Sequence, residues 1–168
     1  MRVIRVIFVI ETSLGNLLTG KVKAHRLYCL YLISDGESYI YIGSSIGETG
    51  IINRIRNTNP VLKDFREFFL PESLQWQVTI MTLEECLEEY KDKKVGGYFP
   101  LSLHHVTYKW DVLYAERWLV EYHKSFINVI YNSGRYAPIP KKYLTFPCDD
   151  PKYPKILRER FEINRNWR

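Results

Sequence analysis

Four tyrosines lie in a short stretch of the chain that has the pattern of a β-hairpin. Two apolar and β-branched runs, 27–33 and 38–42, flank an Asp35-Gly36 turn signal, and Asp-Gly between such runs indicates a hairpin. A phenol can position a water molecule or, if its pKa is lowered, accept a proton. Tyrosines in strands are also ordinary packing residues. The hairpin alone therefore indicates either role for its tyrosines, which are Tyr28, Tyr31, Tyr39 and Tyr41.

A carboxylate at the border of an apolar helix face is a second candidate for chemistry. Apolar residues recur at helical spacing over 112–126 and predict a buried stripe formed by Val112, Ala115, Leu119, Tyr122 and Phe126. Glu116 lies at the edge of this stripe, so its carboxylate points either to solvent or into a cleft. Glu121 falls on the opposite side, within reach of Arg117 and Lys124, as a surface ion-pairing residue does.

The tyrosine hairpin contains a pair of motifs. Cys29-Leu30-Tyr31 on the first strand, followed by Tyr41-Ile42-Gly43 on the second, resembles the paired motif of the GIY-YIG nuclease superfamily. Cys29 stands where that family prefers Gly.

The resemblance extends to three residues further along the chain. Members of the superfamily carry an Arg on the helix after the second motif, a Glu on a later helix and an Asn beyond that Glu. Arg54, Glu116 and Asn128 supply them in the same order. Arg56 is an alternative to Arg54 for the arginine role. The resemblance covers roughly 27–58 and 112–132 of the chain.

This resemblance implies catalytic roles in the hydrolysis of a DNA phosphodiester. Glu116 would bind one Mg²⁺ or Mn²⁺, a hard cation that suits a carboxylate and several waters. Arg54 would donate to the non-bridging phosphate oxygens. Tyr31 would act as general base or position the water, and Tyr41 would hydrogen-bond the nucleophile or the scissile phosphate. Asn128 would brace the site through its amide. No nucleotide cofactor is expected.

These roles place a demand on the hairpin. A two-residue turn at Asp35-Gly36 would pair Tyr31 with Ile40 and put Tyr31 and Tyr41 on opposite faces of the sheet, because side chains alternate along a strand. A catalytic role for both tyrosines therefore predicts a three-residue or bulged connection.

A second proton donor has no clear candidate. The position four residues after Arg54 is Thr58, so a donor would come from elsewhere, for example from His104 or His105. A loop or capping role is the favoured interpretation of both histidines.

The other elements predict one α+β domain over 1–168. We expect a small antiparallel or mixed sheet with the hairpin 27–42, flanked by helices, with a long insertion at about 57–110 and a basic C-terminal extension. Further strands are predicted at 3–10 and 74–81, where the second leads into a Thr82–Glu85 capping box and a helix over 83–94. Helices are also predicted over 51–56 and from Pro60, and Asp111 is the expected N-cap of the helix over 112–126.

Composition narrows the class of function. The net charge is +5, with basic residues on both sides of an acidic segment, 64–100, and the basic, aromatic C-terminal stretch suits a polyanion or a solvated helix. No apolar run is long enough to span a bilayer. Scattered cysteines argue against a zinc site or a disulfide framework and favour a cytoplasmic location.

The expected function is a magnesium-dependent endonuclease acting on double-stranded DNA, of restriction type. A phage, mobile-element or repair nuclease, or a non-catalytic nucleic-acid-binding module, is the alternative. A double-strand cut by an enzyme with one site per chain needs a homodimer or two successive nicks.

Overall fold

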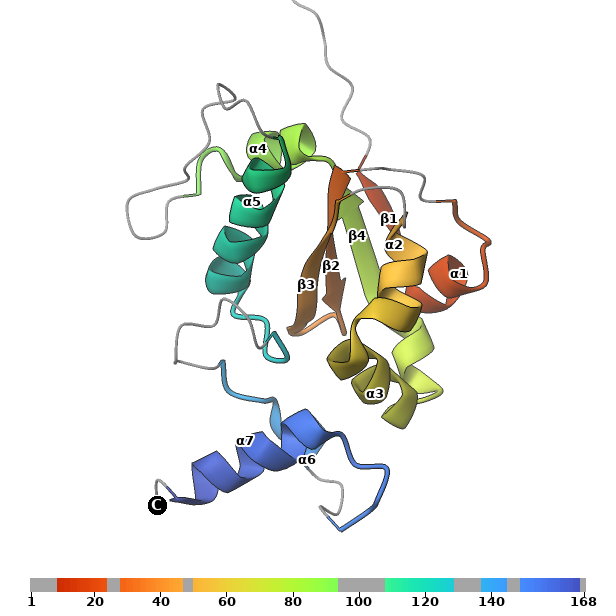
Figure 1. Ribbon diagram of the computed structural model, residues 1–168, viewed down its shortest axis with the longest axis vertical. Helices are drawn as coiled ribbons and strands as arrows, with labels where there is room; N and C mark the ends of the chain where they lie inside the picture. Colours follow the sequence, from red (N-terminus) through yellow and green to blue (C-terminus); the bar gives the residue numbers. More distant parts are fainter. Residues whose placement is uncertain are drawn as a thin grey trace, which may run out of the picture.

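Four antiparallel strands form the sheet at the centre of the computed structural model (Figure 1). The structure describes residues 9–23, 28–46, 50–93, 108–128, 137–144 and 149–166. The strands are β1 (Ile10–Ser13), β2 (Tyr28–Ser34), β3 (Tyr39–Ile46) and β4 (Gln77–Met81), in the order β1-β4-β2-β3. The predicted α+β class is confirmed. Most of the strand predicted at 3–10 lies outside the described residues.

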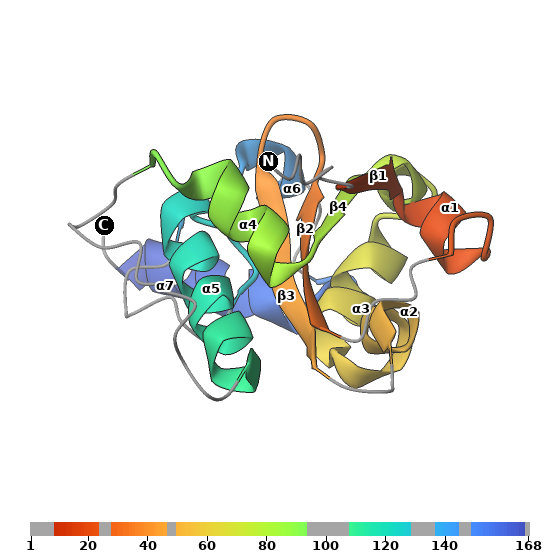
Figure 2. The same ribbon diagram turned by 90° about the horizontal axis from the view of Figure 1, so that it is seen from above.

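Helices cover both faces of this sheet (Figures 1 and 2). One face carries α1 (Leu14–Leu18), α2 (Gly50–Asn53), the π-helical turn η1 (Arg54–Thr58), α3 (Pro60–Phe68) and the short 3₁₀ helix η2 (Glu72–Gln75). The other face carries α4 (Leu83–Tyr90) and α5 (Tyr108–His123). The C-terminal segment adds α6 (Lys141–Leu144) and α7 (Lys155–Asn166). Among the helices described, none is long and apolar enough to cross a bilayer.

Strand β2 is buried on both sides, which explains its nearly continuous apolar sequence. Cys29, Tyr31 and Ile33 pack toward α1, α2 and α3, whereas Leu30 and Leu32 pack toward α4 and α5. Tyr31, which is one of the predicted catalytic residues, therefore lies on the face of the sheet that α1 to α3 cover.

The segment predicted as an insertion at 57–110 forms part of the central sheet. It supplies β4, which lies between β1 and β2, together with α3 and α4 on opposite faces. The acidic segment 64–100 includes β4 and most of both helices. Its described part therefore has a structural role, as the strand predicted at 74–81 and the helix predicted from Leu83 indicated.

Three predicted boundaries are wrong. The strand predicted to stop at Ile42 continues to Ile46, because Gly43, Ser44 and Ser45 keep pairing with β2. Helix α5 begins at Tyr108, so Asp111 lies in its first turn and is not its N-cap. Helix α4 ends at Tyr90, about one turn before the predicted end. The capping box is confirmed: the Thr82 amide donates to Glu85 Oε2 at 2.8 Å, and the Glu85 amide donates to Thr82 Oγ1 at 3.2 Å.

An aromatic cluster joins α4 and α5 around His123. The Tyr90 hydroxyl and His123 Nε2 are 2.7 Å apart, and the Tyr39 and His123 rings lie 3.9 Å apart between centroids, tilted by 36°. Burial, assisted by the positive charge of Lys93, lowers the pKa of His123 to about 4. The folded protein therefore holds this imidazole in its neutral form at neutral pH.

We predict that His123 makes the protein less stable in weak acid. The pKa of His123 in the unfolded chain is about 6.5. Between pH 6.5 and pH 4 the imidazole is therefore protonated in the unfolded chain but remains neutral in the folded protein. Stability is therefore complete above pH 6.5 and declines as pH falls toward 4, by about 1–2 kcal/mol after allowance for partial exposure. Urea unfolding at several pH values should show this decline, and His123→Gln should flatten it. An unchanged slope in the variant would refute the assignment.

Candidate active site

The turn between β2 and β3 is longer than two residues. Asp35 Oδ1 accepts hydrogen bonds from the backbone amides of Glu37 and Ser38, at 2.9 and 2.8 Å, and the Asp35 amide donates to the Ser38 carbonyl at 3.2 Å. Gly36 has φ +97°, a conformation that suits glycine. The pairing register shifts between Ile33 and Ser34, so the hairpin contains a bulge.

This bulge places the two predicted tyrosines on one face. Tyr31 pairs with Gly43 and Ile33 pairs with Tyr41, and paired residues project to the same side of a sheet. The rings of Tyr31 and Tyr41 lie 6.1 Å apart between centroids, at an interplanar angle of 32°. The bulged connection that the catalytic roles require is therefore confirmed, and the two-residue turn is excluded.

The C-terminal segment holds the bulged turn in place. Asp35 Oδ2 accepts hydrogen bonds from the Tyr143 hydroxyl and from Lys142 Nζ, the latter at 2.8 Å, and Lys142 also pairs with Glu37 at 3.0 Å. Burial raises the pKa of Asp35, but hydrogen bonds from Lys142, Tyr143 and the two turn amides outweigh it and lower the pKa overall. Helix α6 thus clamps the turn, a role that the basic composition of this extension did not indicate.

Gly43 leaves room for the Tyr31 and Tyr41 rings to lie over its backbone in β3. A Cβ atom at this position would lie 2.5 Å from Tyr31 Cζ and 2.8 Å from Tyr41 Cε1. Separations below 3 Å are sterically forbidden unless an atom moves, and Tyr31 is only 2% exposed. A side chain at position 43 is therefore incompatible with this arrangement of the two rings.

Glu116 on α5 contacts β3 next to this glycine. Its Oε2 accepts a hydrogen bond from the Ser44 hydroxyl. Burial raises the pKa of Glu116, and the Ser44 hydrogen bond and the Arg54 charge oppose the rise. Of the two orientations that the sequence allowed, Glu116 takes the inward one. Glu121 pairs with Arg117 at 3.6 Å on the exposed side of α5, as predicted.

Arg54 belongs to η1, which lies on the opposite face of the sheet from the helix α5 that carries Glu116. Its positive charge acts to lower the pKa of Tyr31, Tyr41 and Glu116, which places the guanidinium near all three side chains. Within the described ranges, no acceptor pairs with its buried Nε. Arg56 instead donates to the Leu18 carbonyl of α1 and is exposed. Of the two arginines, Arg54 is the one whose charge acts on the tyrosine pair.

Both phenols are neutral at physiological pH. Burial raises the pKa of Tyr31 well above 10, and the nearby Tyr41 and Glu116 raise it further, against the lowering effect of Arg54. Burial, followed by the charge of Glu116, raises the pKa of Tyr41 to about 12, although Arg54 and hydrogen bonds with Tyr31 and Asn59 lower it. In the free protein both groups can orient a bound molecule by hydrogen bonding, whereas neither is a strong base.

Asn128 braces β3 from its outer edge. The Ile42 amide donates to Asn128 Oδ1 at 2.9 Å, and Asn128 Nδ2 donates to the Ile42 carbonyl at 2.7 Å. The Ser125 hydroxyl donates to the same Oδ1 at 2.6 Å. The bracing by an amide that the sequence predicted is thus present, and it acts on the strand backbone one residue before Gly43.

We predict that Asn128→Ala destabilises the protein by about 2–4 kcal/mol. The substitution leaves the buried amide and carbonyl of Ile42 without partners, and each unsatisfied group costs roughly 1–3 kcal/mol. Urea unfolding measures the loss. Asn57→Ala is the matched control, because Asn57 is an exposed amide that bonds, among the described residues, only to Asn53 at 2.6 Å. Equal stabilities for the two variants would contradict the bracing role.

Two residues that the sequence did not single out also shape the site. Asn59 caps α3 by accepting from the Leu62 amide at 3.1 Å, and its Nδ2 donates to the Tyr41 hydroxyl. An Asn before Pro60 is a recognisable helix-start signal, but its second contact is not visible in the sequence. Ser44, which donates to Glu116, lies beyond the predicted end of the strand at Ile42. The side chain of Thr58, and all of His104 and His105, lie outside what the structure describes.

The donor set fits a weakly held hard cation. Among the described residues, no group of three or more His, Cys, Asp or Glu side chains gathers as an all-protein metal cage would require. Glu116 offers one carboxylate, and no donor in the described ranges engages its Oε1. Mg²⁺ commonly keeps several waters and uses one or two carboxylates together with substrate phosphates. Glu116 is therefore the residue that would hold such an ion.

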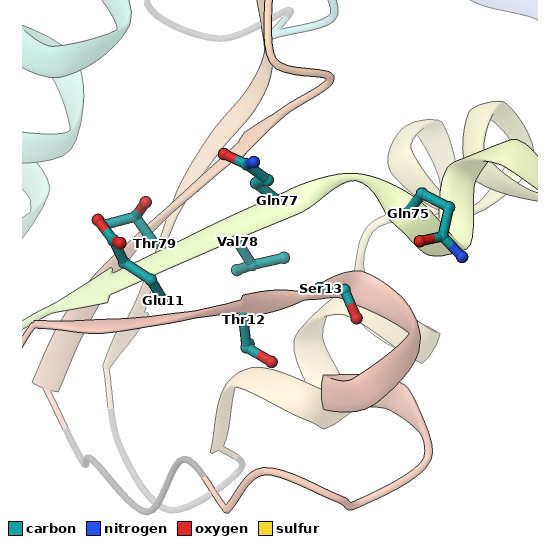
Figure 3. A pocket seen from close by; sticks show the side chains of 7 residues that line it. All are labelled: Glu11, Thr12, Ser13, Gln75, Gln77, Val78 and Thr79. Carbon is teal, nitrogen blue, oxygen red and sulfur yellow. The ribbon is translucent and has the colours of Figure 1, made fainter.

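A separate pocket lies over β1 and β4 (Figure 3). It encloses about 350 Å³ and is lined mainly by polar side chains, including Glu11, Gln77 and Thr79. Its lining includes none of the five predicted site residues. The tyrosine pair and the pocket are thus distinct features of the sheet.

No model of a known protein family, no curated protein and no solved structure matches this chain.

Proposed function

We propose that this protein is a metal-dependent endonuclease that hydrolyses DNA phosphodiester bonds. The observation that carries the proposal is the bulged turn, which puts Tyr31 and Tyr41 side by side on one face of the sheet. Arg54 and Glu116 come from opposite helical layers and act electrostatically on both rings. Phosphodiester hydrolysis can use a metal ion and preorganised cationic or hydrogen-bond donors at the developing negative charge. Glu116 would supply the metal ligand, and Arg54 and the two phenols would supply the donors.

Each side chain has a role in this proposal. Glu116 holds one Mg²⁺ or Mn²⁺, which when bound supplies positive charge to a phosphate oxygen. Arg54 donates to the non-bridging oxygens as negative charge develops on them. Tyr31 orients the attacking water. Tyr41, held by Asn59, hydrogen-bonds the water or the scissile phosphate.

Gly43 and Asn128 serve this arrangement through the backbone. Gly43 leaves space over the strand for the two rings. Asn128 fixes the strand that carries Tyr41, through both polar groups of Ile42. Both are positioning residues, since neither needs to touch the DNA.

The biological role that we favour is restriction-type cleavage of double-stranded DNA, with a phage, mobile-element or repair nuclease as the alternative. The extra segments of the chain pack onto the nuclease-like hairpin: the segment 57–110 supplies an internal strand, and α6 clamps the turn. This construction suits a compact enzyme. Two strand cuts from one site per chain would require a homodimer or successive nicking.

Incubation of the protein with supercoiled plasmid tests the proposal. We expect conversion to nicked or linear DNA in Mg²⁺ or Mn²⁺ and none in EDTA, with discrete sequenced ends if cleavage is sequence-specific. Arg54→Ala should abolish turnover. DNA binding without turnover in any divalent metal would refute the nuclease and support a non-catalytic nucleic-acid-binding module.

A further inference from the structure

Arg66 on α3 is a mostly buried cation whose ion pair with Glu67 is long. Its side chain is 12% exposed, and its nearest carboxylate, on the adjacent and largely exposed Glu67, is 3.9 Å away. No hydrogen-bond acceptor in the described ranges pairs with its buried Nε. A guanidinium removed from water in this way is costly unless a partner compensates for it.

A second arginine makes this arrangement less favourable still. Burial lowers the pKa of Arg66, the carboxylate of Glu67 opposes this, and the positive charge of Arg56 adds to the lowering. The two arginines belong to η1 and α3, which pack against each other. Arg56 is exposed and is fixed by its bond to the Leu18 carbonyl of α1. The like charges of Arg56 on η1 and Arg66 on α3 repel each other in the free protein, and a bound anion would relieve this repulsion.

We propose that Arg56 and Arg66 form an anion subsite for a backbone phosphate of the bound nucleic acid, distinct from the scissile phosphate. Arg guanidinium groups pair with phosphate oxygens by two parallel hydrogen bonds. Arg54 and Arg56 are two residues apart, so their Cα atoms are at most about 7 Å apart. Because the charge of Arg54 acts on the tyrosine pair and that of Arg56 acts on Arg66, one strand can contact both places through phosphates close to each other in sequence.

This inference rests on the proposed function for its ligand. The subsite would fix the register of the strand, so that the phosphate beside Tyr31 and Arg54 is the one placed for attack. Arg66 is in this sense a binding and positioning residue, with no part in the bond-breaking step.

Arg66→Met tests the subsite in the full-length chain, because Met keeps much of the length of the side chain and removes its charge. In EDTA, where no cleavage occurs, we expect the affinity for a short DNA duplex to fall about tenfold or more. The slope of log K against log salt concentration should decrease by about one, as for the loss of one phosphate contact. Arg66→Lys should restore part of the affinity. The matched control is Arg117→Met, which removes an exposed, ion-paired arginine from α5.

Thermal unfolding with inorganic phosphate as the probe separates this subsite from a purely structural role. Phosphate should raise the Tm of the wild type and have a smaller effect on Arg66→Met, whose Tm without phosphate should equal or exceed that of the wild type. Unchanged DNA affinity and salt slope in Arg66→Met would overturn the proposal, as would a lower Tm with no phosphate effect in either protein. Binding that depends on Arg66 in a protein that never cleaves would keep the subsite and refute the nuclease.

Discussion

Replacing Glu116 by Gln is expected to reduce metal-dependent DNA cleavage by roughly a thousandfold or more while leaving DNA binding intact. Gln retains the size of the side chain and its hydrogen bond with Ser44, but it removes the charge that would hold a divalent cation. Binding in EDTA should be equal or tighter, because a negative charge next to the phosphate is lost. Cleavage rates and affinities measured in parallel separate the two effects.

Glu121→Gln is the matched control for this variant. Glu121 lies on the same helix, and its pairing with Arg117 is on the exposed side. Its loss should leave cleavage within about twofold of the wild type, since exposed ion pairs contribute little. If Glu116→Gln cleaved as well as Glu121→Gln, Glu116 would not be the metal ligand.

Glu116→Gln should also change the unfolding temperature and the ionisation of the tyrosines, which are measured without an activity assay. Burial raises its pKa in the folded protein, so ionisation at neutral pH costs stability, and Glu116→Gln should unfold at a higher temperature at pH 7. The charge of Glu116 raises the pKa of both Tyr31 and Tyr41. Ultraviolet titration should therefore show tyrosine ionisation at lower pH in the variant. A substitution that raises stability and abolishes catalysis identifies a residue that is kept for function at a cost in stability.

The sequence predicted the parts of the site that depend on local pattern. Alternation along the strands showed that Tyr31 and Tyr41 could share a face only across a bulged turn, and the bulge is present. Helical spacing placed Glu116 at the border of the buried stripe and Glu121 on the exposed side, as found. The capping box at Thr82 needs only neighbouring residues, and it too is present.

What the sequence did not predict depends on contacts between distant segments. Gly43, Ser44 and Ser45 have the local pattern of a strand break, yet pairing with β2 keeps them extended. The hydrogen bond of Ser44 to Glu116 spans 72 positions, and that of Tyr143 to Asp35 spans 108. No local propensity carries such information, because these contacts exist only once the layers have packed. The choice between Arg54 and Arg56 was open for the same reason.

Gly43→Ala is expected to cost about 1–3 kcal/mol of stability and to reduce cleavage about a hundredfold. The added Cβ would lie 2.5 Å from Tyr31 Cζ and 2.8 Å from Tyr41 Cε1, and Tyr31 is too buried to move aside. Overpacking of this size forces rings or backbone out of place, and displacement of a catalytic group by about 1 Å can cost two orders of magnitude in rate. Urea unfolding and plasmid cleavage measure the two losses.

A double-mutant cycle assigns the loss to the ring contact. Tyr31→Leu removes the aromatic ring that the Cβ would strike, so the stability cost of Gly43→Ala should shrink by about 0.5–3 kcal/mol in that background. Ser45→Ala is the control on the same strand and face, since the Ser45 hydroxyl is buried and has no hydrogen-bond partner in the described ranges; its stability should change little. Strict additivity of Gly43→Ala and Tyr31→Leu would mean that the glycine is not needed for the passage of Tyr31 over β3. Coupling would show that the small residue after Ile42 and the phenol on the neighbouring strand act as one unit, in which the space left by Gly43 keeps Tyr31 beside Tyr41.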